Sequence, residues 1–94
     1  MEIRVAISMT YYVYILKCKD GSLYTGSTND YKRRFLEHKE GEGAKYTRAK
    51  GVQKIVHVEE FATKNEALKR ESKIKSLTRK KKLALILYGT NYIV

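Results

Sequence analysis

The feature that most constrains the fold is a pair of apolar, tyrosine-rich runs, 12–18 and 23–28, on either side of Asp20-Gly21. Runs rich in Tyr, Val, Ile and Thr favour strands, and Asp-Gly between two such runs is a strong hairpin signal. The first run is apolar at odd and even positions alike, which is typical of a strand with no solvated face. We therefore predict a hairpin whose first strand is central in the sheet and is covered by helices.

The length of the turn decides whether Tyr14 and Tyr24 share a face. A two-residue loop places the two tyrosines on opposite faces, whereas the three-residue loop 19–21 places them on one face. The longer loop needs a left-handed residue, and Gly21 adopts that conformation without strain. A phenol adds a hydrogen-bond donor and acceptor that packing alone does not use. A site that employs both tyrosines therefore requires the three-residue loop.

Five further elements follow the hairpin, because capping residues and glycines divide the rest of the chain. The capping box Thr63 to Glu66 is the clearest of these helix signals. The predicted elements are a helix from Asn29 or Asp30 to about 40, a short helix 44–50, a strand 52–61, a helix from 64 to about 77 and a helix 79–88 capped by Thr78. We predict an α+β (mixed α/β) domain, a small three-stranded antiparallel sheet flanked by helices.

The charge of the chain favours a polyanionic partner. Twenty Lys and Arg against ten acidic residues give a formal net charge of +10. Nucleic acid is the common partner of such a surface and an anionic membrane the less common one, while a merely solvated basic face is the structural alternative. The side chains that we expect to bind nucleic acid are Lys17, Lys45, Arg48, Arg79, Lys80, Lys81 and Lys82.

Cysteine content and apolar run lengths bear on the compartment. A single cysteine, Cys18, excludes an intramolecular disulfide, and no run reaches the length of a membrane span. With no signal sequence visible, we expect a cytoplasmic protein that does not bind membranes and is a monomer or a weak dimer.

The chain resembles the GIY-YIG nuclease family in the order Tyr12-Val13-Tyr14, Tyr24-Thr25-Gly26, Arg34 and Glu71. The stretches DGSLYTG, GAKYTRAKG and EALKRESKIKSLTRKKK are similar to its short, stand-alone bacterial branch, most of whose members are uncharacterised. The resemblance implies a GIY-YIG endonuclease-like fold for 10–94 as a single domain, with 1–9 as an N-terminal extension. It also implies a metal-dependent endonuclease that hydrolyses DNA phosphodiester bonds, in repair or recombination.

The resemblance also implies a role for each matching residue. Glu71 corresponds to the glutamate that holds one Mg²⁺ or Mn²⁺ ion, and Gly26 to a glycine where a side chain would crowd the site. Arg34 suits the non-bridging phosphate oxygens, because its guanidinium is a planar fork of donors. The residues that the family pattern makes catalytic are Tyr14, Tyr24, Arg34, His38 and Glu71.

One departure from the family pattern keeps other functions open. Many members have an Asn shortly after the glutamate, where this chain has Ser72 and Lys73. Two further departures are mild: Tyr12 replaces the first Gly of the pattern and Thr25 replaces an Ile. Glu71 can also pair with Lys75 four residues on, as an ordinary helix ion pair. The alternative is a catalytically weak or inactive nucleic-acid-binding module with the same fold. A third hypothesis is a protein-interaction domain whose basic face binds an acidic partner.

Overall fold

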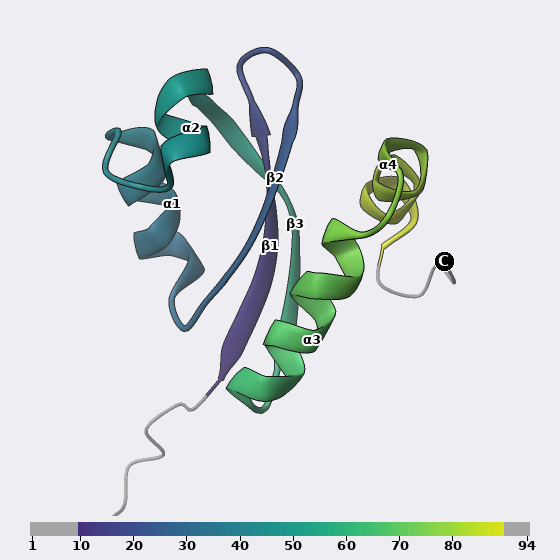
Figure 1. The fold of residues 1–94 in the computed structure, drawn as a ribbon. Coiled ribbons are helices and arrows are strands. Elements are labelled where there is room, and N and C mark those ends of the chain that lie inside the picture. The colour runs from purple at the N-terminus through teal and green to yellow at the C-terminus, as the bar shows by residue number, and fades with distance from the viewer. Residues whose placement is uncertain (1–9, 90–94) are drawn as a thin grey trace, which may run out of the picture.

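Three strands form one antiparallel sheet in the computed structural model, which describes residues 10–89 (Figure 1). The strands β1 (Tyr11–Cys18), β2 (Leu23–Thr28) and β3 (Val52–Phe61) pair in the order β2-β1-β3. The first strand of the hairpin is therefore central, as its two apolar faces predict. The segment predicted as an N-terminal extension, 1–9, lies outside the described residues.

Helices cover both faces of the sheet (Figure 1). The pair α1 (Tyr31–Lys39) and α2 (Lys45–Lys50) lies on one face, and α3 (Lys64–Lys75) lies on the other, followed by α4 (Arg79–Tyr88). Successive residues of β1 divide between two apolar clusters, one on each face. The first cluster contains Val13, Ile15, Ala67, Ile74 and Leu85, and the second contains Tyr14, Leu16 and Val52, packed against Phe35 and Tyr24. The α+β fold predicted from the sequence is confirmed.

The hairpin turn has the three-residue form. Gly21 N–H donates to the Cys18 carbonyl at 2.9 Å, and Cys18 N–H donates to the Ser22 carbonyl at 2.8 Å. Gly21 has φ +87°, the left-handed conformation that only glycine adopts without cost. In the resulting register Leu16 lies opposite Tyr24, so Tyr14 and Tyr24 are on one face.

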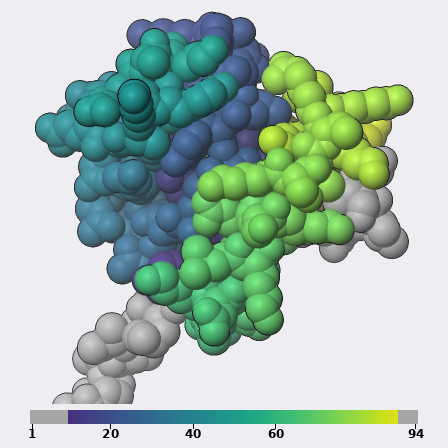
Figure 2. Space-filling model, in the orientation of Figure 1, coloured from purple at the N-terminus to yellow at the C-terminus, as the bar shows by residue number. Residues whose placement is uncertain are grey.

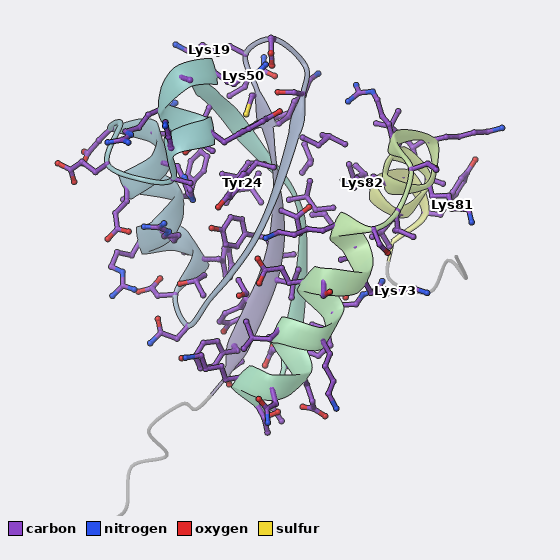
Figure 3. The ribbon with its side chains drawn as sticks, in the orientation of Figure 1. Lys19, Tyr24, Lys50, Lys73, Lys81 and Lys82 are labelled. Atoms are coloured by element: carbon purple, nitrogen blue, oxygen red, sulfur yellow. The ribbon has the colours of Figure 1, made fainter. Side chains whose placement is uncertain are left out.

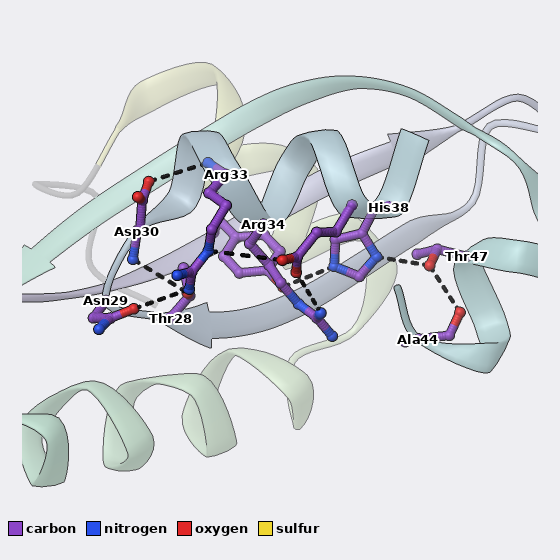
Figure 4. Close-up of polar contacts among 10 residues, drawn as sticks. Thr28, Asn29, Asp30, Arg33, Arg34, His38, Ala44 and Thr47 are labelled. Carbon is purple, nitrogen blue, oxygen red and sulfur yellow. Dashed lines mark hydrogen bonds and ion pairs between the residues drawn. The ribbon is translucent and has the colours of Figure 1, made fainter. Parts of the chain in front are cut away.

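Side-chain caps fix where the helices begin. Asp30 accepts a hydrogen bond from Arg33 N–H at the start of α1 (Figure 4), and Thr78 does the same for Lys81 N–H at the start of α4. Thr63 and Glu66 form the predicted capping box of α3. Each cap satisfies an exposed amide at a defined residue and so sets which side chains of the helix face the sheet.

One helix differs from its prediction. By helical spacing its sequence predicts an apolar stripe of Ala67, Leu68, Ile74 and Leu77, but Leu68 is 43% exposed. Ala67 and Ile74 alone are buried there, and the helix ends at Lys75 rather than near Leu77. Although α3 contacts all three strands, Leu68 lies in a surface hollow that Glu71 also lines.

Candidate functional site

The site is centred on Tyr14, whose side chain extends from the central strand β1 over the edge strand β2. Tyr14 pairs with Gly26 and its buried ring lies over that glycine. A Cβ atom added to Gly26 would lie 2.6 Å from Tyr14 Cζ, closer than two carbons can approach. The missing side chain therefore creates the space that the phenol occupies. The Tyr14 hydroxyl continues to His38 Nε2, at 3.0 Å.

His38 on α1 connects Tyr14 to α2 through a chain of hydrogen bonds (Figure 4). His38 Nδ1 is 2.7 Å from Thr47 Oγ1, and the Thr47 hydroxyl donates to the Ala44 carbonyl at 2.9 Å. A hydroxyl has one proton, so Thr47 accepts from His38 Nδ1–H. In neutral His38 the other ring nitrogen, Nε2, is then an acceptor, and it accepts a hydrogen bond from the Tyr14 hydroxyl.

The pKa values of both groups agree with this direction of donation. Burial and, second, the positive charge of Arg34 together lower the pKa of His38 to about 4. Burial raises the pKa of Tyr14 to about 12, with a second contribution from Tyr24. A hydrogen bond from Arg34 opposes that rise. At neutral pH the pair is therefore a protonated phenol and a neutral imidazole.

Tyr24 extends the aromatic cluster from the buried relay to the surface of α2. Its ring centroid is 5.3 Å from that of His38 and 6.4 Å from that of Tyr14. On the other side it stacks on Tyr46, at 5.9 Å and 27°, and Lys50 Nζ lies 5.5 Å from the Tyr46 centroid. Tyr46 is 40% exposed, so an aromatic face beside a cation adjoins the site.

Glu71 reaches the same edge strand from the opposite face of the sheet. Ser27 Oγ donates to Glu71 Oε1 at 2.7 Å, and Lys75 Nζ is 2.9 Å from Glu71 Oε2. Gly26 and Ser27 are neighbours on β2, and the charge of Glu71 contributes to the raised pKa of Tyr14. The expected residues therefore converge at the edge of the sheet, with Glu71 coming from the α3 side and not from the tyrosine face.

This edge of the sheet lies in a groove. In the space-filling view, atoms of the hairpin form the floor between α1 and α2 on one side and α3 and α4 on the other (Figure 2). Tyr24 projects toward the α1 and α2 side (Figure 3). Arg34 on α1 is partly exposed, and its guanidinium donates to Glu37. A linear polyanion that lay in this groove would meet both the relay and the carboxylate.

Basic side chains occupy both walls of the groove. Lys50 lies on the α2 wall and Lys82 lies on the side of α4 toward the hairpin, whereas Lys81 lies on the side of α4 that faces away from it (Figure 3). Arg79 donates to the Gly21 carbonyl at 3.1 Å and so joins α4 to the hairpin turn. Lys17 differs from the rest, because strand alternation places it on the face opposite Tyr14 and Tyr24. The expected cations that lie exposed are Lys45, Arg48, Arg79, Lys80 and Lys81, while Lys82 is half-buried.

The oxygen atoms at Glu71 are of the kind that a hard divalent cation prefers. Residues 10–89 contain no group of three or more His, Cys, Asp or Glu side chains that could enclose a metal. Glu71 lines a hollow of about 240 Å³ with Leu68, Ser72 and Lys75, and Ser27 adds a hydroxyl. Mg²⁺ keeps several waters and binds through one or two carboxylates plus phosphate oxygens, so an open site of this kind suits it.

The family follows from the comparison with known proteins. The family model of the GIY-YIG catalytic domain matches residues 10–84. The chain belongs to the GIY-YIG catalytic domain family. Among its relatives, a UPF0213 protein of Staphylococcus saprophyticus is 53% identical over 79 residues, which cover 84% of this chain and 96% of the relative. A UPF0213 protein of Clostridium perfringens is 59% identical over 75 residues, 80% and 81% of the two chains.

Solved structures agree with this GIY-YIG assignment. The solution NMR structure of a UPF0213 protein from Bacillus halodurans matches with TM-score 0.56 and 49% identity, over 89% of this chain and 90% of that one. An E. faecalis protein, also solved by solution NMR, matches with TM-score 0.57 and 41% identity, over 90% and 94%. The resemblance to the short, stand-alone branch of the GIY-YIG family is thus confirmed. In residues 10–89 no helix is long and apolar enough to span a membrane.

Three residues of this GIY-YIG site escape a prediction from the sequence, whereas a fourth, Lys75, is predicted only as a helix ion pair. Thr47 and Tyr46 belong to the short basic helix α2. The signal in the sequence that could have indicated them is a tyrosine and a threonine that stand between Lys45 and Arg48. Ser27 lies one residue after the tyrosine-glycine motif, on the alternate face that meets α3. Lys75 is the expected i,i+4 partner of Glu71, and its ammonium contacts the carboxylate that the family pattern assigns to the metal.

Proposed function

We propose that this GIY-YIG protein is a metal-dependent endonuclease that hydrolyses phosphodiester bonds in DNA. One observation carries the proposal: the Tyr14–His38 relay and the Glu71 carboxylate meet at Gly26 and Ser27 on the edge strand, in a groove with basic walls. Membership of a nuclease family supports the reaction class, whereas the residues of this chain support the assignment of roles.

The geometry suggests how protons move in the reaction. Water that lies at the groove end of the relay would donate a hydrogen bond to the Tyr14 oxygen. As that oxygen takes the water proton, Tyr14 passes its own proton to His38 Nε2, and Thr47 holds the imidazole in the accepting tautomer. The pKa values of about 12 for Tyr14 and about 4 for His38 keep the phenol protonated and the imidazole neutral, so activity that depends on the relay should be lost as the pH falls toward 4 and should be level through the neutral range.

Arg34 and Glu71 have complementary tasks in this scheme. Arg34 would bind the non-bridging phosphate oxygens and stabilise the charge that accumulates on them. Glu71, with Ser27, would hold the divalent ion, Mg²⁺ or Mn²⁺. When bound, that ion supplies Lewis-acid activation of the phosphate and makes the leaving oxygen a weaker base. A substrate such as branched or damaged DNA, a role in repair or recombination, a cytoplasmic location and a monomeric or weakly dimeric state remain parts of the proposal.

Plasmid nicking tests this function directly. With Mg²⁺ or Mn²⁺ present, we expect the wild type to nick supercoiled DNA, and Glu71→Ala and Tyr14→Phe to lose roughly 100-fold or more of the rate. The controls are Glu42→Ala, an exposed acid, and Tyr11→Phe, which packs in the other apolar cluster. Wild-type cleavage no greater than that of Glu71→Ala and Tyr14→Phe would exclude the enzyme.

A nucleic-acid-binding module without catalysis is the second candidate. It is favoured by Ser72 and Lys73, which stand where many members have Asn, and by the two bonds that already engage the Glu71 carboxylate. Such a module would bind DNA in a salt-dependent way, because bound cations displace counterions. Its DNA affinity would be indifferent to Glu71→Ala or would rise, and no divalent ion would be required.

A further inference from the structure

The Glu71 carboxylate is engaged at both oxygen atoms. Oε1 accepts from Ser27 Oγ at 2.7 Å and Oε2 lies 2.9 Å from Lys75 Nζ. The Glu71 side chain is 16% exposed, whereas the Lys75 side chain is 56% exposed. The carboxylate is therefore held in a nearly covered position, and its ammonium partner has free access to solvent.

Lys75 occupies one of the two places where a divalent ion would bind. A cation at Oε2 would lie within a few ångströms of the ammonium, and like charges at that distance repel strongly in a partly desolvated site. Ser27 is fixed on a strand and its hydroxyl is compatible with a metal ligand. Lys75 has a long, mobile stem, so it is the group that can leave.

The surroundings offer Lys75 a second partner. Glu71 and Lys75 both line the hollow beside the groove, so a phosphate that entered this hollow would come within reach of the ammonium. A flexible ammonium makes point-charge contacts to phosphate readily. The energy lost when the ion pair opens would then be recovered in a new pair with the nucleic acid.

We propose that Lys75 is the resident counter-ion of Glu71 and moves to a phosphate of the nucleic acid when the divalent ion binds. This inference rests on the proposed function, because it takes Glu71 as the metal ligand. It makes the free protein a poor metal binder, and it couples metal binding to nucleic-acid binding. By thermodynamic reciprocity, each ligand raises the affinity for the other by the same factor.

Metal titration of the free protein tests the first half of the inference. Mn²⁺ dissociation constants are measured by electron paramagnetic resonance for the wild type, Lys75→Ala and Lys75→Gln. We expect both variants to bind Mn²⁺ about tenfold more tightly, since the competing charge is gone. Lys73→Ala is the matched control, because this exposed lysine lies two residues away on the same helix and does not face Glu71 (Figure 3). It should change the constant less than about twofold.

A second titration tests the movement of Lys75. The same constants are measured with a short DNA duplex in excess. We expect the tenfold difference between the wild type and Lys75→Ala to fall below about twofold, because the phosphate now holds the wild-type lysine. A difference that persists in the presence of DNA would show that Lys75 stays on Glu71 and would overturn the inference.

The remaining outcomes separate this inference from the proposed function. Equal or weaker Mn²⁺ binding by both Lys75 variants, with wild-type circular dichroism, overturns it, as does undiminished binding by Glu71→Ala. Tighter Mn²⁺ binding by the Lys75 variants supports it even if no form of the protein nicks DNA, in which case the enzyme claim fails alone. If the wild type nicks DNA but Lys75→Gln binds Mn²⁺ with the wild-type dissociation constant, the enzyme claim stands and the inference about Lys75 fails.

Discussion

His38 joins the relay to the stability of the fold, because it is buried as a neutral ring. Its pKa of about 4 lies below the ordinary 6.5, so between these values the unfolded chain binds a proton that the folded chain does not. The sign follows from linkage: stability from this group is complete above pH 6.5 and is lost as the pH falls toward 4.

Acid unfolding measures the protonation of His38. Between pH 7.5 and 4.5 we expect the wild type to lose about 2–3 kcal/mol more unfolding free energy than His38→Gln, which has no ring to protonate. Urea unfolding at the two pH values supplies the comparison. His57→Gln is a poor substitute as a control, since His57 donates to buried Glu59, so the exposed Lys39→Gln serves instead. Equal losses in the wild type and His38→Gln would show that the imidazole is not desolvated.

Thr25 differs from His38, because its buried polar group has no hydrogen-bond partner among the described residues. The position carries Ile in the family pattern, and here the hydroxyl oxygen is buried. Replacing a buried unsatisfied hydroxyl by a methyl of the same shape removes a desolvation cost. We expect Thr25→Val to raise the unfolding free energy by about 1 kcal/mol in urea titrations. Thr47→Val should lower it instead, because the Thr47 hydroxyl bonds both His38 and Ala44.

At the scale of elements, α3 depends on a buried ion cluster for its orientation. Arg70 donates through Nε and Nη2 to the two oxygens of Glu59 on β3, at 2.8 and 3.0 Å, and His57 donates to the same carboxylate at 2.7 Å. Burial raises the pKa of Glu59, but these bonds outweigh it and leave the pKa below its ordinary value. Because Arg70 precedes Glu71, the cluster fixes the face of α3 that meets Ser27.

Removing one partner should cost far more than removing both. Arg70→Met leaves Glu59 buried with less compensation, and we expect a loss of about 3 kcal/mol in unfolding free energy. The double change Glu59→Leu with Arg70→Met should recover most of that loss. Lys69→Met, an exposed neighbour, is the control. If Arg70→Met and Lys69→Met behave alike under thermal unfolding, the cluster does not hold α3.

The elements could be predicted because their signals are local. Asp30, Thr63 and Thr78 cap helices at the predicted residues, and Gly21 gives the turn its three-residue form. The site could be predicted only in part. Its chemistry follows from residue types in family order, but the approach of Glu71 from the opposite face depends on how α3 packs on the sheet. No spacing in the sequence encodes that packing.

Contacts between distant segments explain the remaining misses. The Thr47 hydroxyl selects the tautomer of His38, and this follows from the packing of α2 on α1 rather than from any motif. Leu68 fits an apolar stripe by its period, yet it is 43% exposed, while Ala67 and Ile74 on the same helix are buried. Periodicity thus indicates a helix face, while the packing of that face on the sheet decides which of its side chains are buried.

At the scale of the whole molecule, charge and shape together favour an extended polyanion. The chain has a net charge of +10, and cations such as Lys50 and Lys82 lie on the two sides of a groove whose floor is the hairpin. Tyr46 adds an exposed ring on one wall, stacked on Tyr24 of the floor. Electrostatic and aromatic contributions to binding respond differently to salt, so they can be separated experimentally.

Salt titration of DNA binding distinguishes the two contributions. We expect Lys45→Ala and Arg48→Ala each to reduce the slope of log affinity against log salt by about 0.7–0.9, because each loses one phosphate contact. Tyr46→Ala should lower the affinity roughly tenfold at every salt concentration and leave the slope unchanged, while Tyr46→Phe should retain most of the affinity. Fluorescence anisotropy with a labelled oligonucleotide gives both quantities. If Tyr46→Ala changes the salt slope, or if Lys45→Ala and Arg48→Ala leave it unchanged, the nucleic acid binds away from the α2 wall. It then also binds away from the Tyr14–His38 relay.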